Sequence, residues 1–346
     1  MDAERRAFLD ELLATPTPAG YEARGQRVWV DYVSAFADEV HTDAYGNAVA
    51  VVEGGATEFA VAGHGDQIGL VVTDVDGAFV HVEPIGGADR TVTKGQHVTV
   101  HTDDGTVPGV VGQTAIHLRE DDDEHEDISE QFVDVGADDE DAARDLVSVG
   151  DPVTITGRTQ DLAGERVAAR GMDNRVGIWV AAEALRRAAE RDVDATVAAV
   201  STVQEEVGLK GAQMVGYDLD PDAVVAVDVT HASDSPAFPS DRHADVTLGG
   251  GPVVTRGSSN HPALVDAARD GADGDVQVRA AGTRTSTDTD AFYVQRGGVP
   301  ALSLGIPNRY MHTPVEVVDL RDVDAAATLC AAMAAEAHDR TFAVDV

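Results

Sequence analysis

The sequence contains very little cysteine and lysine and no long apolar run. Cys330 is the only cysteine in 346 residues, so an intrachain disulfide is excluded, and its alanine-rich surroundings predict a buried, inert thiol. No stretch of about 18 apolar residues is present, which argues against a membrane-spanning helix. Residues 1–6 open with acidic side chains and lack the apolar core of a signal peptide. We therefore expect a cytoplasmic protein.

Positive charge is also scarce. Lys94 and Lys210 are the only lysines, and 62 acidic residues against 25 Lys and Arg give a formal net charge of -37. Nucleic acids and anionic membranes would repel such a chain, so neither is an expected partner. Surface carboxylates repel one another much less in molar salt, where the Debye length is only about 3 Å. The composition therefore predicts a halophile's protein.

Several common signatures are missing too: a glycine-rich phosphate loop, a serine nucleophile elbow and an internal repeat. The 43% of hydrophobic residues can fill a large core, and the length predicts about two domains. Within residues 71–165, short β-branched segments alternate with Gly and Asp turns, which is typical of a small β-rich module. We expect an α/β domain of residues 1–70 and 166–346, with a PDZ-like or barrel-like insertion of residues 71–165.

Apolar periodicity predicts the helices and strands of the α/β domain. Helices are expected over residues 3–14, 22–36, 176–191, 262–271 and 320–339, with further helices opening at Lys210 and Thr289. Strands are expected over residues 48–52, 58–62, 195–203, 223–227, 275–280 and 299–305. The acidic segment 119–127 lacks the glycine and the ligand alternation of an EF-hand, so we interpret it as a solvated loop.

Two adjacent glutamates, Glu205 and Glu206, follow directly on the apolar run of residues 195–203. Such a run is typical of a strand buried on both faces, and open α/β sheets bind ligands at the carboxyl ends of their strands. Adjacent carboxylates repel each other unless a positive charge lies beside them, so a metal ion is one explanation. Two solvated glutamates at the start of a helix are the other explanation, and this segment alone does not decide between the two.

Other predicted strand ends carry residues of the same chemistry. His64 ends one buried strand, and Asp66 would point to the same face, a common arrangement of a metal ligand and its carboxylate partner. Asp228 follows another buried strand, and His312 follows a fourth. Asp173 precedes a helix, where its ordinary role would be that of an N-cap.

Together these residues make a site of His, Asp, Glu, Asp and His at one sheet edge. Imidazole and carboxylate donors without thiolate suit Zn²⁺, Co²⁺ or Mn²⁺. Two such ions about 3.5–4 Å apart, bridged by a carboxylate and a water, can clamp the attacking and leaving atoms of a hydrolysis. A remaining glutamate would then act as general base.

Five motifs in this order resemble those of the TET-type dizinc aminopeptidases, the glutamyl aminopeptidase group of the tetrahedral metallopeptidases. The motifs are His64-Gly-Asp66, Met172-Asp173-Asn174-Arg175, Gln204-Glu205-Glu206-Val207-Gly208, Val227-Asp228-Val229-Thr230 and Arg309-Tyr310-Met311-His312. The resemblance spans nearly the whole chain and implies a phosphorylase/hydrolase-like mixed sheet with helices on both faces. Gln67, where the family often has an acidic residue, and Met172 are departures that remove no ligand. With the net charge, the resemblance points to a halophilic archaeon.

The resemblance implies two divalent metal ions per subunit, Zn²⁺ or Co²⁺, with Mn²⁺ as a third choice. Asp173 would bridge the two ions. His64 and Asp228 would complete one site, and Glu206 and His312 would complete the other.

The resemblance also implies the remaining roles. Glu205 would take the proton from the attacking water and return it to the leaving amine, and Asp66 would orient His64. Peptides would be the substrates, because the reaction would be removal of N-terminal residues. The β-rich insertion would be the dimerisation module of a homo-oligomer, commonly a hollow tetrahedral dodecamer built from dimers.

Other functions stay open on the sequence alone. A dimetal exo-deacylase or carboxypeptidase of the same clan would usually carry its second module after the Glu pair, whereas here it precedes Asp173. A glycosidase needs two catalytic carboxylates and no His ligands. An inactive paralogue serving as an assembly subunit would not need the full ligand set. The preferred N-terminal residue is not predicted, because Arg284 and Arg309 could select acidic side chains or form structural salt bridges.

Overall fold

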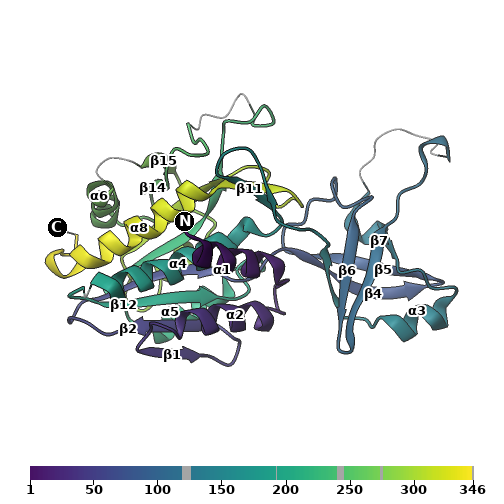
Figure 1. Ribbon diagram of the computed structural model, residues 1–346, viewed down its shortest axis with the longest axis horizontal. Coiled ribbons are helices and arrows are strands. Elements are labelled where there is room, and N and C mark those ends of the chain that lie inside the picture. The colour runs from purple at the N-terminus through teal and green to yellow at the C-terminus, as the bar shows by residue number, and fades with distance from the viewer. Residues whose placement is uncertain (119–125, 192, 240–244, 273–275, 345–346) are drawn as a thin grey trace.

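Eight strands form a mixed sheet at the centre of the larger part of the molecule (Figure 1). The structure is a computed structural model, and it describes residues 1–118, 126–191, 193–239, 245–272 and 276–344. In order across the sheet, the strands are β1 (Glu39–Thr42), β2 (Ala48–Val52), β12 (Thr196–Thr202), β3 (Glu58–His64), β13 (Ala223–His231), β16 (Ala301–Asn308), β14 (Val253–Gly257) and β15 (Gln277–Ala281). The predicted α/β class is confirmed.

Four neighbouring strands at the centre, β12, β3, β13 and β16, run parallel to one another. Nearly all of their residues are buried, as expected for strands covered on both faces. Thr202 of β12 lies directly opposite His64 of β3, so these two strands end side by side. The carboxyl ends of all four strands therefore form one edge, which is where an open α/β sheet binds its ligands.

Helices cover both faces of the sheet. Alternate residues of β3 show the division, because Phe59 and Val61 belong to one hydrophobic cluster while Ala60 and Ala62 belong to another. The first cluster includes residues of α1 (Ala3–Ala14), α2 (Ala23–Val33), α4 (Met172–Arg191), α6 (Pro262–Gly271) and α8 (Leu320–Glu336). The second includes residues of α5 (Lys210–Asp218) and α7 (Thr289–Phe292).

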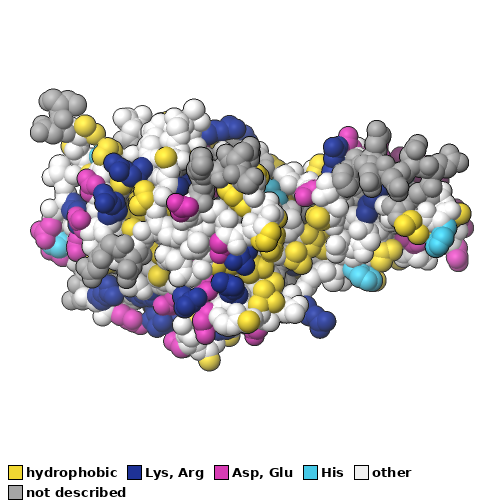
Figure 2. All heavy atoms as spheres, turned by 90° about the horizontal axis from the view of Figure 1, so that it is seen from above, with side chains coloured by type: hydrophobic (Ala, Val, Ile, Leu, Met, Phe, Trp, Pro, Cys, Tyr) yellow, Lys and Arg dark blue, Asp and Glu magenta, His cyan; other side chains and the backbone are white. Residues whose placement is uncertain are grey.

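Six strands close a barrel at one end of the molecule (Figure 1). Around the barrel they are β4 (Gly69–Asp76), β5 (Phe79–Ile85), β8 (Phe132–Asp134), β7 (Gly105–Val111), β6 (His97–Thr102) and β9 (Pro152–Ile155), and α3 (Glu140–Leu146) packs against them. Valine side chains dominate the interior. The predicted β-rich insertion is thus a barrel, and hydrophobic side chains gather on the surface where it meets the larger body (Figure 2).

A small three-stranded sheet and three short 3₁₀ helices complete the described structure. The strands are β10 (Gln160–Asp161), β11 (Arg166–Ala169) and β17 (Glu316–Asp319). The 3₁₀ helices are η1 (Ile116–Leu118), η2 (Ile128–Glu130) and η3 (Ala337–Asp339). In sequence, β11 leads into α4 and β17 leads into α8, so this sheet lies beside the start of two helices that cover the main sheet.

Several sequence predictions can be compared with the structure. β13 continues to His231, so Asp228 lies inside a paired strand, opposite Gly305, and not beyond the strand's end. The start of the strand predicted at residues 275–280 lies outside the described residues, as does most of the acidic segment 119–127. Cys330 is buried, as predicted. Among the described residues, we find no helix that combines the length and the apolar character needed to cross a bilayer.

Candidate metal centre

His64 is the last residue of β3, and its side chain is buried at the carboxyl edge of the sheet. Its Nδ1 atom lies 3.3 Å from Asp66 Oδ1, so the two side chains point to the same side, as predicted. Helix α4 packs closely here, because a Cβ atom at Gly63 would come within 2.5 Å of the backbone of Gly177. Glycine at residue 63 therefore allows the start of α4 to lie against the end of β3.

Glu205 and Glu206 lie in the turn between β12 and α5. Gln204 has a φ of 55°, a left-handed conformation that redirects the chain directly after the strand. Asp66 holds this turn, since its Oδ1 accepts the backbone N–H of Glu205 at 2.9 Å and its Oδ2 accepts that of Glu206 at 3.0 Å. Glu22 accepts the backbone N–H of Gln204 at 3.1 Å. Asp66 thus positions both glutamates, a role that the sequence did not indicate.

Asp173 lies at the beginning of α4, but it does not cap the helix. Asn174 supplies the cap, because its Oδ1 accepts the backbone N–H of Gly177 at 3.0 Å. The Asp173 carboxylate lies between two imidazoles instead, 3.1 Å from His64 Nε2 and 3.3 Å from His312 Nε2. The interpretation of Asp173 as only an N-cap is therefore wrong. A carboxylate with one oxygen toward each of two donor groups has the geometry of a bridging ligand.

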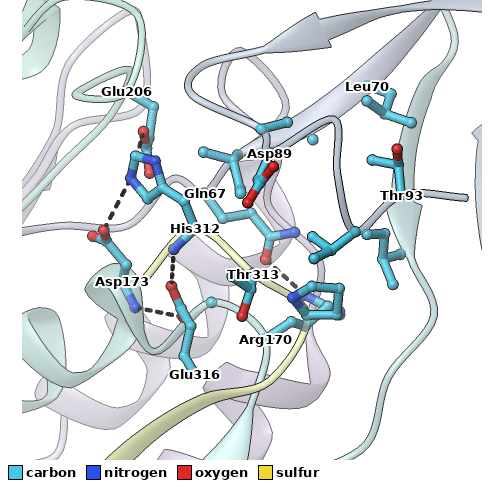
Figure 3. A pocket seen from close by; sticks show the side chains of 17 residues that line it. Gln67, Leu70, Asp89, Thr93, Arg170, Asp173, Glu206, His312, Thr313 and Glu316 are labelled. Carbon is cyan, nitrogen blue, oxygen red and sulfur yellow. Dashed lines mark hydrogen bonds and ion pairs between the residues drawn. The ribbon is translucent and has the colours of Figure 1, made fainter. Parts of the chain in front are cut away.

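His312 comes from the turn that follows β16 and has a φ of 62°. Glu316 fixes this turn, because its carboxylate accepts the backbone N–H of His312 at 2.9 Å and that of Asp173 at 3.2 Å (Figure 3). From the barrel side, the carbonyl oxygen of Gly87 lies 3.1 Å from His312 Nδ1. The imidazole is thus held between body and barrel, with Nε2 facing Asp173 and Glu206.

In each of two groups of three side chains, the possible metal-donor atoms lie within 4.8 Å of one another. They are His64, Glu205 and Asp228, and Asp173, Glu206 and His312. Glu205 Oε2 and Asp228 Oδ1 each lie 3.8 Å from His64 Nε2. The structure therefore brings the five predicted ligands together at the sheet edge, and it places Glu205 close enough to the first group to be a ligand as well.

Burial and the crowding of like charges shift the pKa values of this cluster. Burial, together with the neighbouring negative charges, raises the pKa of Glu205 to about 10 and that of Glu206 to about 8. Burial opposes ionisation of Asp173 too, but its contacts with the two imidazoles hold its pKa below the usual value. The Asp173 carboxylate in turn raises the pKa of His312 to about 9.

The cluster fits a pair of divalent cations. Four carboxylates face only two imidazoles, and Glu206 Oε1 is buried without a hydrogen-bond partner among the described residues. A buried carboxylate oxygen of this kind is unfavourable unless a proton or a cation satisfies it. The donors are nitrogen and oxygen atoms without thiolate, which is a set that Zn²⁺, Co²⁺ and Mn²⁺ accept.

The cluster lies between two cavities. A cleft of about 470 Å³ has both groups of donors in its wall. A second, much smaller cavity of about 40 Å³ is lined in part by barrel residues, among them Leu70 and Thr93 (Figure 3). Asp173, Glu206 and His312 belong to the walls of both cavities. The larger cleft is therefore the one of the two with room for a bound substrate.

The sequence did not indicate the roles of three further buried residues. Glu316 acts through backbone N–H groups, as described above. Asp288 accepts the hydroxyl of Thr202 at 2.5 Å, and burial raises its pKa to about 7. Arg175 donates to the carbonyl oxygen of Asp66 at 3.1 Å and so supports the segment after His64. Glu316 and Asp288 lie in no recognised motif, and Arg175 follows Asp173 in one without an indicated role, so only the fold shows these contacts.

The two arginines considered for substrate selection do not line the cavities. Arg309 forms a bidentate pair with Asp234, with N–O distances of 2.8 and 2.6 Å. This is the structural salt bridge that the sequence left open. Arg284 is exposed and makes no ion pair with any residue that the structure describes. Neither residue belongs to the described wall of either cavity.

Comparisons with known proteins agree on one family. The family model described as M42 glutamyl aminopeptidase matches residues 46–329. A lysyl aminopeptidase of Pyrococcus furiosus is 34% identical over 345 residues, covering 97% of this chain and 98% of that protein. The structure of a TET aminopeptidase from a marine sediment archaeon of the Thaumarchaeota is similar with a TM-score of 0.90 and 27% identity, covering 96% of this chain and 97% of that one. The structure of the TET1 peptidase of Pyrococcus horikoshii, described as able to assemble into a tetrahedron or a large octahedral shell, is similar with a TM-score of 0.85 and 29% identity. The similarity covers 96% of this chain and 99% of that one.

Proposed function

Since the chain belongs to the M42 glutamyl aminopeptidase family and is a peptide hydrolase, we propose that it removes N-terminal residues with two divalent cations held around Asp173. Asp173 would bridge the ions, His64 and Asp228 would complete one site, and Glu206 and His312 the other. The observation that carries this proposal is the Asp173 carboxylate, which lies 3.1 Å from one imidazole and 3.3 Å from the other. Zn²⁺ or Co²⁺ is the expected metal, with Mn²⁺ third.

When bound, the two cations would supply Lewis acidity toward the scissile carbonyl and lower the pKa of the attacking water. The side chains of the protein position the reacting groups and transfer the proton. Asp66 holds the two glutamates in place through their backbone N–H groups and orients His64. Glu205 takes the proton from the attacking water and delivers it to the leaving amine. It belongs to the wall of the larger cleft and not to that of the second cavity, which supports substrate binding in the cleft.

Glu205 is assigned proton transfer although it is close enough to His64 to bind a cation. With Asp173 as a bridge, each ion already has three protein donors, which is the number typical of a catalytic site with an open position. Glu205 is then the carboxylate left to exchange protons with the water and the amine.

The substitution Glu205→Gln tests this assignment. General acid–base catalysis contributes about 10²–10⁴-fold, so we expect kcat to fall by that factor while two metal ions per chain are retained. His312→Ala is the comparison, because it should lose one of the two ions. Metal analysis of dialysed protein and kcat on an aminoacyl p-nitroanilide are the measurements. An active Glu205→Gln protein, or one that has lost an ion, would contradict the assignment.

The direction of cleavage is tested with one peptide in three forms: unmodified, N-acetylated and C-amidated. An aminopeptidase shortens the unmodified and the amidated peptide from the amino end and leaves the acetylated peptide intact. A carboxypeptidase fails on the amidated form, and a deacylase acts on the acetylated form. Mass spectrometry of the products after incubation with the Co²⁺-loaded protein distinguishes these outcomes.

We further propose that a domain of residues 71–165 mediates dimerisation, and that the dimers build a closed homo-oligomer, expected to be a tetrahedral dodecamer. Phe79 and Phe132 support an interface on the barrel, since both are partly exposed and pack edge-on with ring centroids 5.1 Å apart. Partly exposed aromatic side chains of this kind are enriched at protein interfaces. Native mass spectrometry tests the proposal, and a monomer at micromolar concentration would contradict it. A cytoplasmic location stays a prediction.

A further inference from the structure

Two arginines beside the metal cluster share one side-chain acceptor. The amide oxygen of Gln67 accepts an N–H of Arg170 at 2.6 Å (Figure 3) and an N–H of Arg175, also at 2.6 Å. Arg175 donates further to the carbonyl oxygen of Asp66 at 3.1 Å and to the hydroxyl of Thr17. All of these acceptors are uncharged. Two positive charges therefore lie close together, and neither forms an ion pair with a carboxylate among the described residues.

This arrangement leaves positive charge poorly balanced. Arg175 is only 2% exposed, and Arg170 is partly buried, with an Nε atom that is buried and has no hydrogen-bond partner among the described residues. Burial lowers the pKa of both guanidinium groups, and the charge of Arg170 lowers the pKa of Arg175 further. A buried charge without a contacting counter-charge is costly, so a negative group beside Arg170 would stabilise the folded protein.

The nearby carboxylates do not fill this role. Asp66 and Glu316 attract Arg175 electrostatically, but both oxygens of each carboxylate accept backbone N–H groups at the metal cluster. Asp89 lines the second cavity together with Arg170, yet its carboxylate accepts a backbone N–H two residues further along at 2.8 Å. No ion pair joins Asp89 to Arg170. The missing counter-charge must therefore come from outside the described part of the chain.

Arg170 belongs to the wall of the second cavity, whose volume is about 40 Å³. A cavity of this size holds a water molecule or a monatomic ion, but it does not hold a peptide residue. Its wall also contains apolar side chains, among them Ile68, Leu70 and Val92. In such surroundings a hydrogen bond from a guanidinium is stronger than in water. Removing an ion from water costs more as its charge rises, so the cavity suits a monovalent anion better than a divalent one.

We propose that the second cavity binds a chloride ion in contact with Arg170, and that this ion supplies the counter-charge that the two arginines lack. The Nε atom of Arg170 is the donor that such an ion would satisfy first. Hydrogen bonds in which both groups are charged are about twice as strong as those between neutral groups. Bromide has the same charge and a similar size, and it therefore serves as a probe of the site.

Carboxylates in the same wall make the site depend on the cations of the proposed function. They belong to Asp89, Asp173, Glu206 and Glu316. Without metal, these groups would repel an anion. Two divalent cations bring four positive charges to the cluster, so an anion is expected in the metal-loaded protein. The inference uses these cations but is independent of the peptide reaction.

The bound ion would support both sides of the cluster. Arg170 directly follows β11 and lies three residues before Asp173, whereas Gln67 directly follows Asp66. An anion that holds the guanidinium of Arg170 in place therefore also holds the segment that leads into α4. We expect chloride to increase the stability of the metal-loaded protein and its kcat/KM.

The test replaces chloride by isethionate, an anion too large for the cavity, at constant total salt and with Zn²⁺ present. Both salts screen surface charges equally, so a difference between them reports binding of the anion. At a chloride concentration of about ten times Kd, mass action multiplies the ratio of folded to unfolded protein by about 11 and raises Tm by roughly 3–6 °C. The kcat/KM on an aminoacyl p-nitroanilide should rise with chloride to a plateau.

Three variants show whether the effect comes from this cavity. Gln67→Glu supplies a carboxylate from within the chain, so its Tm should be the same in both salts. Arg170→Gln removes the residue that contacts the ion and should also abolish the difference. Arg284→Gln is the matched control, because Arg284 is exposed and lies outside the walls of both cavities. It should keep the wild-type difference in Tm.

Anomalous diffraction from crystals of the Zn²⁺-loaded wild type grown in bromide locates the ion. We expect a bromide peak in the second cavity beside Arg170, and no such peak in Gln67→Glu. A wild type with the same Tm in chloride and isethionate would overturn the inference. So would crystals without this peak, or a chloride effect that persists in Gln67→Glu and Arg170→Gln. If a variant does not fold, the two wild-type measurements decide. Neither depends on peptide cleavage, so a failure of the proposed reaction would not affect them.

Discussion

The barrel and the carboxyl edge of the main sheet differ in where their charged side chains lie. The barrel is filled with apolar side chains, and its charged residues pair near the surface, as Lys94 and Glu126 do at 2.5 Å. At the sheet edge, the carboxylates of Asp66, Asp173 and Asp228 are less than 10% exposed. The edge thus contains a concentration of buried negative charge that its two imidazoles do not balance. The barrel folds around an apolar core, whereas the edge needs protons or cations to be stable.

A carboxylate side chain therefore has a different role in each of these two regions. A carboxylate on the barrel surface is solvated, and its removal changes little. A carboxylate at the edge is held by backbone N–H groups and imidazoles in one orientation, so we expect its removal to alter the binding of cations. The same substitution in the two regions should therefore have very different effects.

The largest effect is expected from Asp173→Asn, with Asp104→Asn on the barrel as its control. Partners outside the ligand set of a metal are typically worth about 10–100-fold in affinity or activity, so losing the bridging ligand should cost more than about 100-fold in kcat/KM. Asp104 is exposed, and its substitution should leave kcat/KM within about twofold. Steady-state kinetics at saturating Co²⁺ make the comparison. Similar activity of the two variants would remove the distinction between the regions.

The next effect concerns the pH dependence of the metal-free protein. The folded pKa of Glu206, about 8, lies above its usual 4.5, so the folded state binds more protons and stability falls as the pH rises through this interval. His312 acts in the same direction, because its stabilising contribution is lost as the pH passes its raised pKa of about 9. Between pH 5 and 8, we expect a loss of roughly 2–5 kcal/mol.

Urea denaturation with and without Zn²⁺ measures this effect. Saturation with Zn²⁺ should flatten the profile, since the cations replace the protons as counter-charge. A metal-free protein that is equally stable at pH 5 and pH 8 would show that the carboxylates of the edge are balanced in some other way.

A smaller effect is expected from Glu316→Gln. The Glu316 carboxylate accepts two backbone N–H groups, from His312 and Asp173, and an amide can accept only one of them while its NH₂ group faces the other. We expect kcat to fall by about 10–100-fold and the affinity for one ion to weaken. Glu130→Gln is the control, because Glu130 in the barrel also accepts a backbone N–H, that of Asp127 at 3.1 Å. Equal kinetics of the two variants would assign Glu316 a purely structural role.

The sequence indicated that His64, Glu205 and Glu206 lie at the sheet edge because these residues end or closely follow recognisable buried strands. The turn that holds the two glutamates and the position of Asp228 inside β13 were not predicted. Glu316 was missed since it acts through backbone N–H groups, which leave no trace in the sequence. The place of Arg279 in the wall of the larger cleft was not predicted, because it depends on the order of β13, β16, β14 and β15 across the sheet. Local patterns predict what an element carries, whereas the neighbours of that element depend on topology.

The smallest effect is expected from salt, which changes the repulsion between surface charges and not the buried carboxylates of the sheet edge. The net charge of -37 predicts mutual repulsion that 1 M KCl screens, because the Debye length falls from about 30 Å at 0.01 M to about 3 Å. We expect Tm to rise with KCl, by roughly 2–4 °C for each 1 kcal/mol gained. Thermal melting at several KCl concentrations, with Zn²⁺ present throughout, is the measurement. Full stability in dilute buffer would contradict the predicted halophilic adaptation.

The central claim is that the sheet edge holds two cations on either side of one carboxylate. Anomalous diffraction from crystals soaked in Zn²⁺ tests it most directly. We predict two peaks about 3.5–4 Å apart, one beside His64 and Asp228 and the other beside Glu206 and His312, with Asp173 between them. Peaks at other places only, or no peak at this edge in a protein that is active with Zn²⁺, would contradict the claim.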